Sequence, residues 1–120
     1  MVAWGAHVRT ALQAAEELAD DGRYDVEVID VRTISPFDAE TVVESVRRTG
    51  RAVIVHEAPR TGGFGGEISA RITEEALLRL EAPVRRVAGF DTPPPLAKLE
   101  DYYQPNVELV AQEIITTMEF

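Results

Sequence analysis

The sequence contains no cysteine and only two histidines. Without cysteine the chain forms no disulfide and has no thiolate chemistry, and two histidines do not supply the ligands of a structural zinc site. No apolar run approaches the about 20 residues that cross a bilayer, and no signal-peptide pattern is present. We therefore expect a cytoplasmic protein that does not enter the membrane.

Basic residues are also scarce. The 12 lysines and arginines are outnumbered by 21 aspartates and glutamates, so that the formal net charge is −9 at pH 7. Such a surface repels nucleic acid and anionic lipid, and it attracts a basic protein partner. We expect binding to neither nucleic acid nor membranes.

The length of 120 residues is that of one domain with a core of its own. Its first residues, Met1–Gly5, resemble the end of a strand with nothing before it. Because a core strand needs neighbours that bury it, we expect residues 1–120 to be a single domain of a longer protein whose preceding domain is missing.

Strand-like and helix-like segments alternate along the chain with short connections. Each expected strand is nearly continuous in apolar residues, which is typical of a parallel sheet covered on both faces. We predict a three-layer α/β domain, a mostly parallel sheet flanked by helices, with Val28, Val53, Ile54, Val55 and Val87 in its central strands. The expected strands after Gly5 are residues 25–31, 51–56 and 84–88, and the expected helices are 6–19, 38–49, and those that begin at Glu67 and near Asn106.

Local signals support these helices. Asp38 is a good N-cap for the second helix and Gly50 a good terminator, and Asn106 is placed to cap the last helix. In the first helix the apolar residues at helical spacing are Val8, Leu12, Ala15, Leu18 and Ala19. In the last helix the expected buried residues are Val107, Val110, Ile114, Ile115 and Met118.

The segment 56–68, HEAPRTGGFGGEI, is the most informative part of the chain. It follows a buried strand at the end where parallel sheets place functional groups. It does not match a nucleotide-binding loop, because Ile68 occupies the position of the third glycine and no Gly-Lys-Ser/Thr is present. Glu67 also brings negative charge to the start of the next helix, which disfavours a phosphate there. We interpret the glycines as allowing close approach of a large neighbour such as another subunit.

The two histidines are the other candidates for chemistry. His56 and the adjacent Glu57 point to opposite faces of a strand, so that they do not easily share a ligand. His7 follows another strand and is expected near His56 along the same sheet edge, and a hydrogen-bonded structural role is favoured over catalysis for both. No serine lies in a G-x-S-x-G elbow. We expect no catalytic, cofactor-binding or metal-binding residue in this chain.

Several motifs in register resemble one known family from Val2 to Phe120: V-x-W-G, R-T-I-S-P-F-D, H-E-A-P-R-T-G-G-F-G-G-E-I, L-E-A-P-V-x-R-V, G-F-D-T-P and Y-x-x-P-N. They resemble the C-terminal, transketolase-type domain of the beta subunit of 2-oxo acid dehydrogenase decarboxylase components. HEAP and GFDTP are more similar to branched-chain (2-oxoisovalerate) members than to typical pyruvate members.

The resemblance implies a parent enzyme of two alpha and two beta subunits that uses thiamine diphosphate and magnesium. That enzyme decarboxylates a 2-oxo acid and reductively acylates a lipoyl group, and its cofactor lies between the alpha subunit and the N-terminal domain of the beta subunit. The present domain is then expected to be inactive in isolation and to bind no cofactor. It is expected to contact the alpha subunit and the second beta subunit through Arg60, Gly62, Gly63, Phe64, Gly65 and Gly66.

The resemblance also implies docking of a small, basic partner, the peripheral-subunit-binding domain of the acyltransferase. The expected docking residues are Glu81, Glu119 and Phe120, with the negative end of the last helix beside them. Two other functions stay open. One is the C-terminal domain of a transketolase or deoxyxylulose phosphate synthase-type transferase, and the other is a free-standing regulatory domain with a ligand pocket of its own.

Overall fold

The computed structural model describes residues 1–120, with the side chain of residue 101 left out. Its sheet has four strands in the order β2-β1-β3-β4, and every neighbouring pair is parallel. β1 (Val2–Ala3) and β3 (Val53–Pro59) are central, while β2 (Ile29–Asp30) and β4 (Arg85–Gly89) form the edges. The predicted parallel sheet is confirmed.

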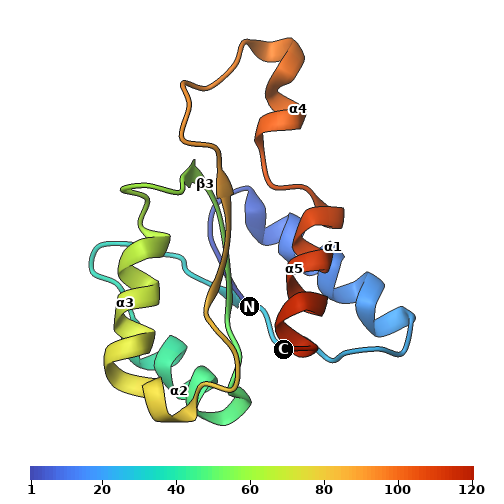
Figure 1. The fold of residues 1–120 in the computed structure, drawn as a ribbon. Helices are drawn as coiled ribbons and strands as arrows, with labels where there is room; N and C mark the ends of the chain where they lie inside the picture. The colour runs from blue at the N-terminus through green and yellow to red at the C-terminus, as the bar shows by residue number, and fades with distance from the viewer.

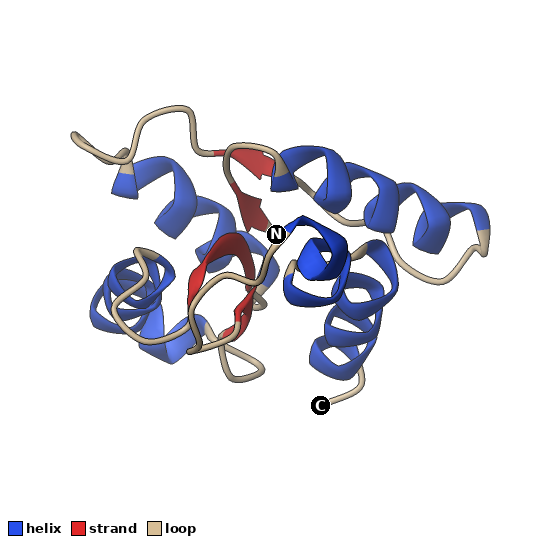
Figure 2. Ribbon diagram, turned by 90° about the horizontal axis from the view of Figure 1, so that it is seen from above, coloured by secondary structure: helices blue, strands red, loops and turns tan.

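Helices cover both faces of this sheet (Figure 1). α1 (His7–Asp20) and α5 (Val107–Met118) pack against one face, and α2 (Ala39–Thr49) and α3 (Gly65–Ala76) pack against the other. Viewed from above, the strands lie between the two pairs of helices (Figure 2). The three-layer α/β class is therefore confirmed. Within the described residues, no helix is long and apolar enough to cross a bilayer.

The expected helix ends are found where the sequence indicates them. Asp38 accepts a hydrogen bond from the backbone nitrogen of Thr41 at 3.1 Å, and it caps α2. Gly50 ends that helix with a φ of 72°, a backbone conformation that glycine adopts without strain. Asn106 caps α5 by accepting from the backbone nitrogen of Leu109 at 2.8 Å.

The second strand is shorter than expected. We predicted a strand over 25–31, but only Ile29–Asp30 pairs, because its neighbour β1 offers only Val2 and Ala3 as partners. Val28 lies before this strand, and Val87 lies in β4, an edge strand. Both were expected in central strands, so that part of the prediction is wrong.

The helices also differ in detail from the expected pattern. Leu12 is 52% exposed, whereas Ala11 and Ala14 are buried, so the buried face of α1 is rotated relative to the predicted stripe. α3 begins two residues before Glu67, and Met118 at the end of α5 is exposed. The short helix η1 (Leu77–Arg79) follows α3 directly, within the length expected for that helix. Two short helical segments had no counterpart among the expected elements: η2 (Ala97–Leu99) and α4 (Glu100–Tyr103).

Candidate functional site

The strand order identifies where this sheet is open to a ligand or partner. From the central strand β1 the chain goes outward to β2, and from the central strand β3 it goes outward in the opposite direction to β4. In open α/β sheets, the crevice beyond the carboxyl ends of two such strands is the usual binding position. Here that crevice lies between residues 4–6, which follow β1, and residues 60–64, which follow β3.

The imidazole of His56 fills this crevice. The ring is fully buried, and the indole of Trp4 stacks on it with 5.0 Å between ring centroids and 9° between planes. The glycine loop, residues 60–66, closes against the edge of the ring. A Cβ added at Gly63 would lie 2.8 Å from Cε1 of His56, and one added at Gly65 would lie 2.4 Å from its Nε2. Such distances leave no room for any side chain at these two positions.

Two further aromatic rings extend this packing toward the surface. Phe64 packs edge-on against Trp4 with centroids 5.9 Å apart, and Phe37 packs edge-on against Phe64 at 5.4 Å. All three rings are partly buried and partly exposed. We call Trp4, Phe37 and Phe64 the aromatic face. Aromatic side chains of this kind are enriched where proteins contact one another.

The structure explains the glycines differently from the sequence analysis. We expected all four to admit another subunit, but Gly63 and Gly65 admit His56 of the same chain. Gly62, with a φ of 74° and open space around it, serves the turn itself. The role of the loop in a subunit interface stays a prediction, and it now depends mainly on the partly exposed ring of Phe64.

Arg60 and Gly66 flank the closed part of the loop. Arg60 is exposed, and its backbone is held by β4, since its nitrogen donates to the Gly89 oxygen at 3.1 Å. Its carbonyl oxygen accepts a hydrogen bond from Nη1 of Arg86 at 3.1 Å. The same guanidinium lies at ordinary contact distance from the position of a Cβ on Gly66. The loop is therefore anchored by β4 as well as by His56.

The histidines lie at this edge, as expected, but without the well-formed hydrogen bonds that we expected for them. His7 and His56 are both buried, and neither ring has a hydrogen-bonding partner of good geometry among the described residues. Burial lowers the pKa of each histidine below its ordinary value of 6.5; Glu57 partly opposes this for His7, and the backbone of Ala58 partly opposes it for His56. Burial thus favours the neutral form of both rings, and their structural role comes from packing rather than from the hydrogen bonds that we expected.

The residues at this edge do not fit a diphosphate. A diphosphate site needs free backbone N–H groups or cations around an open cradle, whereas the nitrogens of Gly66 and Ile68 donate within the loop itself. Glu67 is an exposed acid in the first turn of α3. Among the described residues no group of three or more His, Cys, Asp or Glu is placed to hold a metal. That the isolated domain binds neither thiamine diphosphate nor magnesium stays a prediction.

The three predicted docking residues lie at the opposite, amino edge of the sheet. Glu81 forms an ion pair with Arg51, whose Nε also donates to the Thr117 carbonyl oxygen at 3.2 Å. Arg51 therefore joins the segment before β4 to the end of α5. Glu119 accepts from the Tyr24 hydroxyl at 3.3 Å, and Phe120 is 72% exposed. The structure thus places Glu81 beside the end of α5 but turns Glu119 toward Tyr24.

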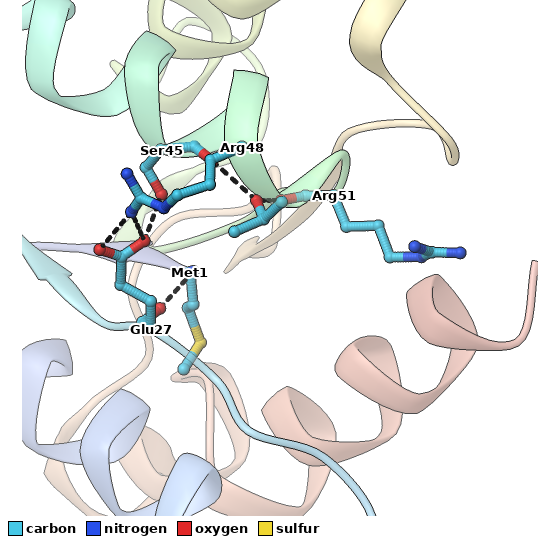
Figure 3. A network of polar contacts seen from close by, with 6 residues as sticks. Met1, Glu27, Ser45, Arg48 and Arg51 are labelled. Atoms are coloured by element: carbon cyan, nitrogen blue, oxygen red, sulfur yellow. Dashed lines mark hydrogen bonds and ion pairs between the residues drawn. The ribbon is translucent and has the colours of Figure 1, made fainter.

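A neighbouring polar network was not foreseen from the sequence (Figure 3). The Glu27 carboxylate accepts from the Ser45 hydroxyl at 2.5 Å and from Nη2 of Arg48 at 2.9 Å. The Ser45 hydrogen bond is the main cause that lowers the pKa of Glu27, with Arg48 adding to it. In Figure 3 the Arg51 side chain points away from Glu27. Since Glu27 lay in a segment read as a strand, no sequence signal linked it to α2.

Together these features describe a parallel three-layer α/β domain whose ligand crevice is filled by its own rings. The family model described as Transketolase, C-terminal domain, matches residues 1–110. The chain therefore belongs to the transketolase C-terminal domain family, which confirms the resemblance seen in the motifs.

Curated relatives that share this domain are named as subunits of dehydrogenases. The chain is 47% identical over all of its 120 residues to the pyruvate dehydrogenase E1 component subunit beta of Staphylococcus epidermidis, of which it covers 37%. It is 53% identical over 106 residues, 88% of its length, to the mitochondrial 2-oxoisovalerate dehydrogenase subunit beta of Dictyostelium discoideum, of which it covers 28%. The chain thus spans only about a third of the length of these relatives.

A solved structure gives the same fold. The chain "Split gene transketolase, inactive beta4 tetramer" matches with a TM-score of 0.84 and 28% identity. The match covers 98% of the present chain and 38% of that chain. Relatives named for pyruvate, for 2-oxoisovalerate and for transketolase therefore share one domain architecture.

The contact between the glycine loop and His56 can be tested by two neighbouring substitutions. Gly65→Ala should lower the free energy of unfolding by roughly 1–3 kcal/mol, because the new methyl group overpacks against His56. Gly66→Ala is the matched control: its Cβ meets only Nη1 of Arg86, at 3.6 Å, and alanine favours the helix by about 0.5–1 kcal/mol. Chemical denaturation of both variants measures the difference. Equal stabilities would contradict the packing described here.

Proposed function

We propose that this chain is the C-terminal domain of the beta subunit of a 2-oxo acid dehydrogenase, and that it serves assembly and docking. The identity of 47% along the whole chain to a subunit of this name is the observation that supports this most directly. The filled crevice at the carboxyl edge agrees with it, since the His56 imidazole in that crevice is fully buried beneath the glycine loop.

The chemistry then belongs to other parts of the parent enzyme. Thiamine diphosphate with magnesium, bound between the alpha subunit and the N-terminal domain of the beta subunit, supplies the decarboxylation of the 2-oxo acid and the reductive acylation of a lipoyl group. The present chain contributes no step to this chemistry. A branched-chain 2-oxo acid is our preferred substrate, because HEAP and GFDTP favour it, and the cytoplasm is our preferred location.

Assembly is assigned to the carboxyl edge. The aromatic face offers partly exposed rings held rigidly by their mutual packing, so that little side-chain entropy is lost when a partner covers them. The partners are the alpha subunit and the second beta subunit. Arg60, exposed beside the loop, adds a cation at the rim of the same surface.

Docking of the acyltransferase is assigned to the amino edge. The end of α5 and Glu119, joined by a carboxylate of Phe120 in a protein that ends there, form an anionic site for a basic peripheral-subunit-binding domain. Glu81 is a weaker candidate than the sequence indicated, because a basic partner has to compete with Arg51 for its carboxylate. The exposed ring of Phe120 gives the partner an apolar contact next to the charge.

A transketolase-type transferase is the second candidate, favoured by the structural likeness to a transketolase chain. The two are separated by assays of the full-length subunit assembled with its alpha partner. We expect oxidative decarboxylation of branched-chain 2-oxo acids, with acylation of a lipoyl acceptor, and no ketol transfer between sugar phosphates. Ketol transfer without decarboxylation would replace the proposed function by the transferase.

The assembly role predicts a specific effect of Phe64→Asp. A carboxylate in the aromatic face should weaken association with the alpha subunit, because it places an unpaired charge in the buried contact. The domain itself should still fold, as circular dichroism can verify. Leu12→Asp, at an exposed position on α1, is the control and should assemble normally. Sedimentation of the reconstituted enzyme measures the outcome, and normal assembly of the Phe64 variant would remove the loop from the interface.

The docking role predicts an effect of deleting Phe120. In a protein that ends at Phe120, the deletion displaces the terminal carboxylate, and it should cost roughly 2–5 kcal/mol of binding free energy if that contact is buried, and far less at a rim. Phe120→Ala retains the carboxylate and separates its contribution from that of the ring. The measurement is calorimetric affinity of the assembled enzyme for the peripheral-subunit-binding domain at two salt concentrations. Unchanged affinity and salt dependence would move docking toward Glu81.

A further inference from the structure

Among the described residues, His56 is the most completely buried polar side chain. Its ring is fully buried, and among the described residues neither ring nitrogen has a hydrogen-bonding partner of good geometry, although the backbone of Ala58 is close enough to favour the protonated form weakly. Trp4 covers one face of the ring, and the backbone of Gly63 and Gly65 lies against its edge. A charged imidazole donates from both nitrogens and requires two acceptors, and this enclosure offers none of good geometry.

We propose that His56 is a pH-sensitive latch for the glycine loop. While the imidazole is neutral, the loop closes on it and holds Phe64 against Trp4; when the imidazole takes up a proton, the loop opens to hydrate it and the aromatic face is lost. The latch itself concerns this chain alone. Its consequence for assembly rests on the proposed function.

The charges around the ring favour the neutral form. Arg86 from β4 and His7 from α1 both act on His56 in the direction that disfavours its protonation. Glu57, the next residue of β3, is exposed and acts on His7. The acid in the first turn of α3 is Glu67. Its side chain is exposed, and its Oε1 lies 3.2 Å from Nε of its ion-pair partner Arg71. Asp91 accepts hydrogen bonds from the backbone nitrogen and the hydroxyl of Thr61 in the loop, at 2.8 and 2.6 Å. The charged groups that act on the His56 ring are Arg86 and His7, and the backbone of Ala58 is the one group among the described residues that favours its protonation.

The direction of the pH dependence follows from these surroundings. Burial, the largest cause, lowers the pKa of His56 below 6.5, whereas in an open or unfolded loop the ring titrates near 6.5. The open state thus binds more protons in acid. The stability of the closed loop is complete above about pH 6.5, and it is lost as the pH falls below that value toward the pKa of the closed form.

The composition of the chain makes the latch easy to observe. It contains one tryptophan, which is the residue stacked on His56, and only two histidines. The emission of Trp4 therefore reports the contact directly. The imidazole Cε1–H signals in an NMR spectrum number two, one for each histidine, and the His7→Gln variant assigns them.

The test is a titration of the 120-residue chain from about pH 8 to about pH 4.5, across the range in which histidine changes charge. We expect the His56 signal to titrate below 6.5, together with a change in Trp4 emission and in the amide signals of Gly63 and Gly65. The amide signals of α5 should stay constant over the same range. Titration of His56 at or above 6.5, or titration that leaves Trp4 and the two glycines unchanged, would overturn the latch.

A variant separates the latch from other acid effects. His56→Phe keeps a flat ring against Trp4 but cannot be protonated, so the acid transition in Trp4 emission should disappear. His7→Gln is the matched control at a second buried histidine, and it should retain the transition. If His56→Phe does not fold, the wild-type titration still decides. If the variant folds and the transition persists, His56 is not its cause and the latch is refuted.

Assembly gives a separate readout. If the aromatic face is the interface, association of the full-length subunit with its alpha partner should weaken in acid, and His56→Phe should remove that dependence. A latch that operates in the isolated chain, with assembly that does not respond to pH, would refute the assembly consequence and the interface assignment while the latch itself stands.

Discussion

The contact between the His56 imidazole and the backbone of the glycine loop determines the geometry of the whole carboxyl edge. Because Gly63 and Gly65 carry no side chain, the loop can lie directly on His56, the last buried residue of β3. α3 then begins at Gly65 without an intervening linker. Phe64, placed between these two glycines, is directed against Trp4 and Phe37. The end of β3, the glycine loop, the start of α3 and the aromatic face thus pack together around His56.

The two edges of the sheet differ in chemistry. The carboxyl edge is closed by neutral rings, while the amino edge has the ends of the helices and several acids that are partly paired with arginines. α2 and α5 both end there, so that the negative ends of their dipoles add to these acids. Arg48 and Arg51 counter this charge locally at Glu27 and Glu81. Such a division suits a domain that joins two kinds of partner at opposite ends.

Much of the architecture could be predicted because it follows from local rules. The caps at Asp38 and Asn106 and the terminator Gly50 depend on neighbouring residues alone, and they were found as expected. The buried face of α1 could not be predicted in the same way. Leu12 is on the exposed side because α5 and the sheet decide which face of the helix is covered, and alanines fit the close approach there. The length of β2 likewise depended on how much of β1 was available for pairing.

The sequence by itself determined the alternation of strands and helices, the parallel class of the sheet, the position of the glycine loop and the excess of negative charge. Each of these is set by composition, by apolar periodicity or by the conformational freedom of glycine. Only the tertiary structure decided what the glycines contact, that His56 has no hydrogen-bonding partner of good geometry among the described residues, and that Glu81 forms an ion pair with Arg51. These features join residues from different elements, such as Trp4 with His56 and Arg51 with Thr117, and sheet packing alone brings them within reach.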